Sequence, residues 1–206
     1  MKLYSFSGSC GLASNIVLEW IGEPYELKLL KRDELATADY RKLNPMGKVP
    51  VLDIDGWILT ENAAVLNYLA EAFPQARLDG DGTPKGRAEA NRWLGLINSE
   101  MHPAYKPLFG TTGYLNDDAA ITKTKDHARA ELRRMFELCN TRLSDRAWLA
   151  GSRSIADAYL FVLLTWAKIV HVDLTGLSHL AEFEHRMRAD AGVQKALKAE
   201  GLAKAA

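Results

Sequence analysis

Cys10 is the residue best placed to do chemistry in this chain. It follows three small residues (7–9) and stands between a strand-like alternation at residues 2–6 and an apolar helical pattern at residues 12–21. A thiol at a helix N-terminus has a lowered pKa, because unpaired N–H groups and the helix dipole stabilise the thiolate. We therefore predict a reactive thiol at position 10; the alternative is an inert turn residue.

The spacing around Cys10 limits its redox chemistry. A thioredoxin-type centre needs a second cysteine three residues later, and that position is Ala13. Cys10 would act alone and form at most a mixed disulfide with a small thiol. The other cysteine, Cys139, repeats with apolar residues on one face of a helix, which predicts a core residue.

A second candidate site lies between residues 49 and 62. Residues 51–54 and 57–60 are apolar runs joined by Asp55-Gly56, a dipeptide that favours a tight hairpin turn. Pro50 cannot donate a hydrogen bond to a sheet, so it fits the first position of a strand, and its bond to Val49 is of the kind that can be cis. The backbone N–H and C=O of Val49 would then be free to bind a partner outside the sheet.

A helical pattern starts directly after this hairpin, at Glu61 and Asn62. A helix N-terminus carries unpaired backbone N–H groups. Together with the carboxylate of Glu61 and the amide of Asn62, these groups suit a ligand that has both an ammonium group and a carboxylate.

Composition excludes several classes of partner. The 206 residues include 26 basic and 26 acidic side chains, so we expect no attraction to nucleic acid or to an anionic membrane. Two cysteines are too few for a disulfide framework, and the first residues lack an apolar signal segment, which favours the cytoplasm. The longest apolar run, residues 155–170, contains Asp157 and Lys168 and predicts a buried helix rather than a membrane crossing.

The pattern changes character once along the chain. Its first part reads strand, helix, strand, helix, strand, strand, helix, which predicts a mixed sheet layered with helices. Turn-forming residues gather at 79–84, and the rest is helical. We therefore expect an N-terminal domain at 1–76, a linker at 77–86 and an all-helical domain at 87–206. The helices predicted beyond the turn cluster span residues 85–110, 117–143, 154–171 and two short segments between 176 and 200.

Five motifs in this order resemble the cytosolic glutathione S-transferases, most closely their bacterial beta class. They are Lys2-Leu3-Tyr4 leading to Cys10, residues 44–50, Leu59-Thr60-Glu61, the stretch from Trp93-Leu94 to Glu100-Met101-His102, and residues 156–161. The resemblance implies an α/β thioredoxin-like N-terminal domain plus an all-α C-terminal domain. It also implies a homodimer, with glutathione as co-substrate and no further cofactor.

The resemblance assigns roles at the glutathione site. Val49, before a cis Pro50, would pair through its backbone with the cysteinyl moiety of glutathione. Glu61 and Asn62 would hold the γ-glutamyl ammonium and carboxylate. The basic residues that would meet the glycyl carboxylate are Lys48 or, alternatively, Lys31 or Lys28.

The resemblance also implies that Cys10 and His102 lie near the glutathione sulfur. The thiol is nucleophilic only as a thiolate, so hydrogen-bond donors beside the sulfur favour the reaction. This chain departs from the class at Gly11, where a serine is common, and so lacks one possible donor. Ser9 and Tyr4 carry the hydroxyl groups that would replace it.

We expect the second substrate in a cleft between the domains. An apolar cleft beside a thiolate suits hydrophobic electrophiles, although the same residue types at helical spacing also suit a core. His102 precedes Pro103, which disturbs a helix, and is either a site residue or an interdomain or capping histidine. The histidines lack metal-ligand spacing, so we predict no metal site. The residues predicted to line the cleft are Met101, Tyr105, Phe109 and Trp166.

The leading prediction is a transferase that joins the thiol of glutathione to hydrophobic electrophiles, in a detoxifying role. The alternative is a glutathione-dependent thiol-disulfide oxidoreductase or a ligand carrier, with Cys10 as a mixed-disulfide site. A third possibility is an interaction module that has lost glutathione binding. The intact residues of the binding corner argue against that possibility.

Overall fold

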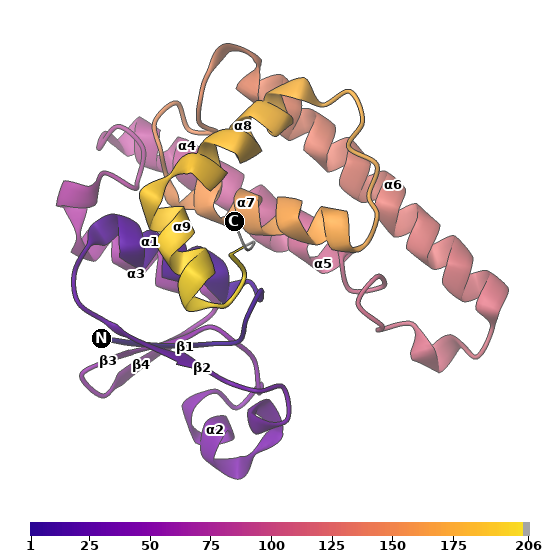
Figure 1. The fold of residues 1–206 in the computed structure, drawn as a ribbon, viewed down its shortest axis with the longest axis horizontal. Helices are drawn as coiled ribbons and strands as arrows, with labels where there is room; N and C mark the ends of the chain where they lie inside the picture. Colours follow the sequence, from indigo (N-terminus) through magenta and orange to yellow (C-terminus); the bar gives the residue numbers. More distant parts are fainter. Residues whose placement is uncertain (204–206) are drawn as a thin grey trace.

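The computed structural model describes residues 1–203. Its first part is a four-stranded sheet in the order β2-β1-β3-β4, with β1 parallel to β2 and antiparallel to β3 (Figure 1). This is the mixed sheet that the sequence predicts. Its elements are β1 (Lys2–Ser5), α1 (Gly11–Ile21), β2 (Glu26–Leu29), η1 (Glu34–Ala36), α2 (Ala38–Leu43), β3 (Val51–Ile54), β4 (Trp57–Thr60), α3 (Asn62–Ala72) and η2 (Pro74–Ala76).

Helices cover the sheet unequally. α1 and α3 lie together on the face that carries the helical part of the molecule, and α2 lies on the other side (Figure 1). In β1 the residues Leu3 and Ser5 are fully buried, whereas Tyr4 between them is only half-buried, as the alternation of a strand requires. The thioredoxin-like arrangement predicted from the sequence is therefore confirmed.

The hairpin between β3 and β4 forms where its turn dipeptide predicts it. Asp55 and Gly56 have φ values of 53° and 92°, the left-handed backbone that a two-residue hairpin turn needs. Ile54 pairs with Trp57, so the turn contains two residues. The Asp53 side chain accepts a hydrogen bond from the Gly56 N–H at 2.8 Å, which closes the turn.

The second part of the described chain is helical, as predicted. The first long helix, predicted at 85–110 with a disturbance at Pro103, is broken there: α4 passes into a π-helical turn, and the His102 N–H bonds to the Ile97 carbonyl. Pro103 follows at once and lacks an N–H, which explains the break. The elements are α4 (Pro84–Leu96), η3 (Ile97–Met101), α5 (His102–Ala104), η4 (Gly113–Leu115), α6 (Asp118–Arg142), η5 (Leu143–Asp145), α7 (Ile155–Ile169), α8 (Ser178–Ala189) and α9 (Ala191–Ala199).

α7 is the centre of the helical part and is buried along most of its length. Its N-terminus has a capping box, in which the Asp157 carboxylate accepts from the Ser154 N–H at 2.8 Å. The same carboxylate accepts from the Leu149 N–H at 3.0 Å. Asp157 is fully buried, so this one side chain fixes both the start of α7 and the loop before it.

The connection between the two parts is an anchored segment rather than a free linker. Leu78 is fully buried, and its carbonyl accepts from the Ile155 N–H at the start of α7, at 3.0 Å. α4 already begins at Pro84, inside the range 77–86 predicted as a linker. Thr83 caps this helix by accepting from the Gly86 N–H.

The last helix returns to the first. α9 lies beside α1 in Figure 1, and α1 also packs against α7, so the sheet part and the helical part share one hydrophobic core. No helix among residues 1–203 is long and apolar enough to cross a membrane.

Candidate functional site

Three chain segments meet at Cys10. Cys10 is the N-cap of α1 and is only 8% exposed. Its Sγ donates a hydrogen bond to the carbonyl of Val49 at 3.5 Å. The Val49–Pro50 peptide is cis, and Glu61, at the start of α3, is close enough for its charge to act on the Cys10 thiol. The sequence-predicted residues Cys10, Val49, Pro50 and Glu61 thus share one corner.

The protonation state of Cys10 differs from the prediction. Burial, together with smaller effects of the charges of Glu61 and Glu200, raises the pKa of its thiol to about 12. The N–H groups of Cys10 and Gly11 act in the opposite direction, as expected at a helix start, but they are outweighed. The prediction of a lowered pKa is therefore wrong, because helix position was weighed without burial.

Ser9 does not replace the missing hydroxyl donor. Its Oγ lies 3.0 Å from the Ser5 Oγ and accepts from the Gly11 N–H at 3.2 Å, all in buried surroundings. A Cβ on Gly11 would lie 2.3 Å from the Ser5 Oγ. Ser5 therefore occupies the space that a side chain at position 11 would need, which explains the departure at Gly11.

Tyr4 also has other contacts. Its ring lies 6.5 Å from the ring of Tyr40, and the Lys2 ammonium lies 5.1 Å from its centroid. Tyr40 belongs to α2, on the outer side of the sheet. Within residues 1–203 no hydrogen bond joins the Tyr4 hydroxyl to Cys10. No contact in the structure therefore supports the predicted role of Tyr4 as a hydroxyl donor.

The start of α3 can bind a ligand through its backbone N–H groups. Glu61 is exposed and has φ 66° and ψ 115°, a strained conformation for a residue with a side chain. No side chain caps the helix, so the first-turn N–H groups remain available. The Asn62 side chain is 5% exposed: its Oδ1 accepts from the Ser14 hydroxyl at 2.8 Å, whereas its Nδ2 is buried and has no hydrogen-bond partner within residues 1–203.

The basic candidates are exposed. Lys48 lies in the turn before Val49, and its backbone carbonyl accepts from the Tyr40 hydroxyl and the Asn44 amide, both at 2.8 Å. The charge of Lys48 lowers the pKa of His102, so these two residues lie near each other across the two parts of the chain. The alternatives Lys28 and Lys31 lie at and just beyond β2.

His102 is a neutral residue in this structure. Burial lowers its pKa to about 4, and the charges of Lys106 and Lys48 act in the same direction. Its Nδ1 is hydrogen-bonded to the hydroxyl of Tyr159, a fully buried residue of α7. Its ring lies edge-on to Trp166, with centroids 5.0 Å apart.

Only part of the predicted apolar lining is accessible. Met101 and Tyr105 are fully buried, and the Tyr105 hydroxyl donates to the Leu163 carbonyl at 2.7 Å, so their predicted role as substrate contacts is wrong. Trp166 is 7% exposed and donates its Nε1 hydrogen to the Gly8 carbonyl at 2.8 Å. Phe109 is 45% exposed and stacks on Tyr105 at 5.7 Å.

Two residues of this region escaped the sequence analysis. Tyr159 orients His102, and Glu200 accepts a hydrogen bond from Gly8 at 2.9 Å. Glu200 lies 192 positions from its partner in the sequence. No local pattern signals such a contact, although a glutamate directly after an amphipathic helix is visible in the sequence.

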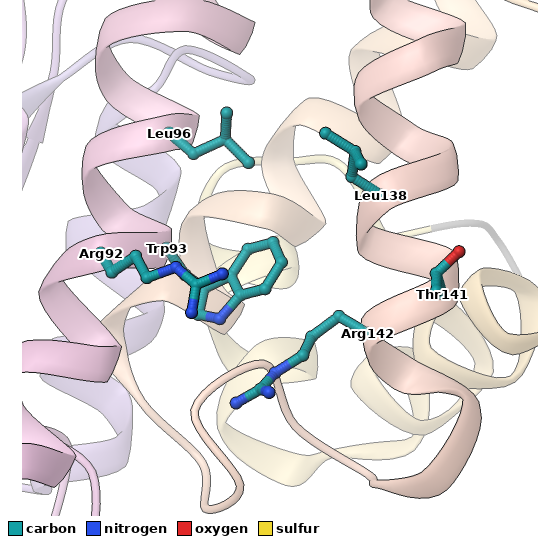
Figure 2. Close-up of a pocket in the computed structure, with 6 residues that line it drawn as sticks. All are labelled: Arg92, Trp93, Leu96, Leu138, Thr141 and Arg142. Carbon is teal, nitrogen blue, oxygen red and sulfur yellow. The ribbon is translucent and has the colours of Figure 1, made fainter.

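A separate groove lies between α4 and α6 (Figure 2). Its volume is about 460 Å³, and it contains none of the residues of the Cys10 corner. Leu96 and Leu138 face each other at one end of the groove, and Arg92, Trp93 and Arg142 lie toward the other end (Figure 2). The residues that line the groove are Arg92, Trp93, Leu96, Leu138, Thr141 and Arg142.

No group of three potential metal-ligating side chains comes together within the part of the chain that the structure describes.

Two family models and several known proteins are similar to this chain. The glutathione S-transferase N-terminal domain model matches residues 9–72, and the C-terminal domain model matches residues 118–190. Glutathione S-transferase GST-4.5 of Xanthomonas campestris pv. campestris is 50% identical over 203 residues, which cover 98% of this chain and all (100%) of that protein.

Solved structures point the same way. The glutathione S-transferase from Xylella fastidiosa is 46% identical with a TM-score of 0.96, covering 98% of this chain and 99% of that one. A sphingomonad glutathione S-transferase complexed with glutathione is 32% identical with a TM-score of 0.86, covering 98% and 100% of the two chains.

Proposed function

The chain belongs to the glutathione S-transferase family, and we propose that it joins the thiol of glutathione to hydrophobic electrophiles at the corner of Cys10, Val49 and Glu61. The activity is that of a transferase. The observation that carries the location is the hydrogen bond from Cys10 to Val49 beside the uncapped start of α3. One corner thus offers a thiol, the backbone of Val49 just before β3, and a helix N-terminus that can bind an anion.

Each part of glutathione has a matching group in this corner. The γ-glutamyl carboxylate would bind the first-turn N–H groups of α3, and its ammonium would bind the carboxylate of Glu61. The backbone of Val49 would pair with the cysteinyl moiety, and Lys48 would meet the glycyl carboxylate. Asn62 would contribute its backbone N–H and its Nδ2, a buried donor without a hydrogen-bond partner within residues 1–203, while its Oδ1 stays bound to Ser14.

Cys10 would turn its one S–H from the Val49 carbonyl to the bound sulfur and act there as a hydrogen-bond donor. A thiol whose pKa is raised to about 12 stays protonated at neutral pH, so it can donate to a thiolate but is a poor nucleophile. In the reaction the glutathione thiol gives its proton to solvent water, and the resulting thiolate attacks the electrophilic carbon, forming a carbon–sulfur bond as the leaving group departs with its bonding electron pair. His102, neutral and close to Lys48, would line the same cleft.

The mixed-disulfide alternative finds less support. Disulfide exchange needs a thiolate on one partner, and burial of Cys10 disfavours that form. We therefore place conjugation, as a detoxification reaction with glutathione as co-substrate and no further cofactor, ahead of the oxidoreductase and carrier functions.

The electrophile would enter beside Phe109, the accessible member of the aromatic group around Trp166. An aromatic wall next to the sulfur suits a hydrophobic electrophile.

The molecule would act as a homodimer. Trp57 on β4 is 54% exposed and packs edge-on against Tyr68 of α3, with ring centroids 5.3 Å apart. We propose that this aromatic pair of one copy docks into the α4–α6 groove of the other (Figure 2). A second docking of the same kind, related by the two-fold axis, would complete the dimer.

The test of the glutathione site uses two glutamates of one helix. Glu61→Gln removes the charge at the start of α3, whereas the control Glu71→Gln removes an exposed charge near its end, 3.7 Å from Arg87. Because hydrogen bonds to charged groups contribute roughly 1.5–3 kcal/mol, the KM for glutathione should rise at least about tenfold in the first variant alone.

Retention on immobilised glutathione and conjugation of chlorodinitrobenzene are the two measurements. The wild-type protein and Glu71→Gln should be retained and active, and Glu61→Gln should be released early. Equal behaviour of all three proteins would show that the tripeptide binds elsewhere.

A further inference from the structure

A buried carboxylate reaches the site from the other end of the chain. Glu200 follows α9 and is 3% exposed. Its Oε2 accepts from the Gly8 N–H at 2.9 Å, and its Oε1 accepts from the Asn15 amide at 3.0 Å. Its backbone carbonyl accepts from the Ser7 hydroxyl at 2.7 Å. Glu200 is thereby bound both to α1 and to residues 6–10, which we call the Cys10 loop.

The Cys10 loop is held from a second side. Trp166 of α7 donates to the Gly8 carbonyl at 2.8 Å, and its ring lies 5.0 Å from that of His102. Gly8 has φ 74°, a conformation that favours glycine. The backbone of Gly8 therefore connects Glu200 to the aromatic wall of the proposed site.

The surroundings of Glu200 disfavour its negative charge. Both oxygens have donors, but its hydrogen-bond partners within residues 1–203 include no basic side chain. Burial raises the pKa of Glu200 to about 7. The titratable groups coupled to Glu200 on α1 are acidic: Cys10 and Tyr25, whose pKa values Glu200 raises, and Glu19, which accepts from the Tyr25 hydroxyl. The lysines of α9, Lys195 and Lys198, are exposed and do not contribute to the pKa shift of Glu200. Glu61 of α3 acts on the same Cys10 thiol.

The negative charge of the buried Glu200 carboxylate lowers the stability of the fold. The pKa of Glu200 is higher in the fold than its ordinary value of 4.5, so between these two values the folded chain binds more protons than the unfolded chain. Stability therefore decreases as the pH rises through this window. A glutamine would fill the same space without the free-energy cost of ionising a buried carboxylate. The presence of a carboxylate at position 200 therefore indicates a role other than packing.

We propose that Glu200 is a positioning residue for the transferase reaction, whose ionised carboxylate holds the Gly8 N–H and so fixes the Cys10 loop beside the bound sulfur. The inference rests on the proposed function, which puts the glutathione sulfur at this loop. A protonated carboxyl group would place its O–H against one of two donors, the Gly8 N–H or the Asn15 amide. One hydrogen bond is then lost, and the loop is held less firmly.

Two variants separate loop positioning from anchoring of α9. Glu200→Gln keeps the shape of the side chain and, like the protonated acid, offers one acceptor in place of two. Asp190→Ala is the control: Asp190 accepts from the Val193 N–H at 3.0 Å and from Trp20 Nε1 at 2.8 Å, so it fixes the other end of α9 to α1 without touching Gly8.

Hydrogen exchange of the peptide that covers the Cys10 loop gives a readout independent of activity. In Glu200→Gln its exchange, corrected for intrinsic rates, should be about tenfold faster, because one charge-assisted hydrogen bond is lost. In the wild-type protein the protection should fall as the pH decreases through about 7, and the variant should lack this step. Identical exchange in wild type and Glu200→Gln would overturn the proposal.

Kinetics provide the second readout. Because a small misplacement of reacting groups reduces turnover strongly, kcat of Glu200→Gln should fall about tenfold, while its KM for glutathione stays within about twofold of wild type. Asp190→Ala should keep its kcat. An equal loss of kcat in both variants would mean that Glu200 only anchors α9, and the proposal would be wrong.

The two proposals fail in different ways. If the wild-type protein neither binds nor conjugates glutathione, the proposed function is wrong, and exchange of the Cys10 loop alone decides whether Glu200 holds it. If conjugation is normal and Glu200→Gln keeps both its kcat and its loop protection, only the role of Glu200 is refuted.

Discussion

Cys10 and His102 show the same physical cause acting on two different groups. Burial disfavours the charged form of each, so the pKa of the thiol rises to about 12 and that of the imidazole falls to about 4. Both residues are therefore neutral at pH 7. A neutral thiol donates a hydrogen bond, and a neutral imidazole can donate or accept one, which suits a site that binds a thiolate rather than one that forms its own.

Replacement of Cys10 tests this assignment. Because a neutral hydrogen bond contributes about 0.5–1.5 kcal/mol, Cys10→Ala should reduce kcat for conjugation by no more than about tenfold. Any exchange with a disulfide of glutathione should disappear. The control Cys139→Ala removes the other free thiol, which is fully buried in the core, and should leave the chemistry intact. A loss beyond about a hundredfold in Cys10→Ala would identify this thiol as essential to the chemical step.

The buried His102 should make the stability of the fold depend on pH. Its pKa is depressed from 6.5 to about 4 in the fold, so the unfolded chain binds more protons between these values. The contribution of His102 is fully present above about pH 6.5 and is lost as the pH falls toward 4. Urea unfolding of His102→Gln should show a shallower decrease of stability over this window than wild type.

The matched control for this measurement is His127→Gln, on the exposed side of α6. It should leave the pH profile unchanged. A profile of His102→Gln that is parallel to that of wild type would contradict the buried, neutral state of the imidazole.

The first turn of α1 depends on a fit between two small residues. Ser5 ends β1 and Gly11 begins α1, and the Ser5 hydroxyl lies where a side chain of residue 11 would be. The strand and the helix can approach closely only because position 11 has no Cβ. The sequence marks Gly11 as a departure from the beta class, but the compensating residue lies six positions earlier and on another element.

Gly11→Ala should destabilise the fold by about 1–3 kcal/mol, because the added methyl group overpacks this contact. Ser5→Ala combined with Gly11→Ala should recover much of the loss, since the atom at 2.3 Å is then removed. Gly95→Ala is the control, because a Cβ at this position in α4 meets nothing within 4 Å and alanine favours a helix. Thermal unfolding of the wild type and the three variants checks the prediction, which fails if the double variant is no more stable than Gly11→Ala.

At the level of elements, the sequence predicted those features that depend only on neighbouring residues. The hairpin follows from Asp55-Gly56, and the start of α7 follows from Ser154 and Asp157. The π-helical turn at residues 97–101 was not predicted, because apolar spacing alone does not show how a helix adjusts to Pro103. The predicted linker at 77–86 was drawn from turn formers, which do not reveal that Leu78 is buried against α7.

For the whole molecule, the shared core joins the beginning and the end of the chain. α1 is enclosed by α3, α7 and α9, so the sheet part cannot lose the helical part without exposing its first helix. The Cys10 loop lies at this junction, where Trp166 and Glu200 hold it from two helices. The geometry of the proposed site is thus a property of both parts together.

The proposed dimer is tested through its groove. Leu138 is 47% exposed within the groove, and Leu138→Glu would place a charge there. Sedimentation velocity should show a dimer for wild type and a monomer for this variant. Ile169→Glu is the control, since Ile169 is 66% exposed at the end of α7 and does not line the groove. A monomeric wild type, or a dimeric Leu138→Glu, would refute this interface.

The sequence alone determined the fold class, the element order, the family resemblance and the identity of the corner residues Cys10, Val49, Pro50 and Glu61. These follow from periodicity, turn chemistry and motif order, which act over a few residues and survive in any environment. Tertiary structure decided the protonation of Cys10 and His102, the inward turn of Asn62 and the burial of Met101 and Tyr105. Burial and long-range hydrogen bonds set these properties, and both depend on residues as distant in sequence as Gly8 and Glu200.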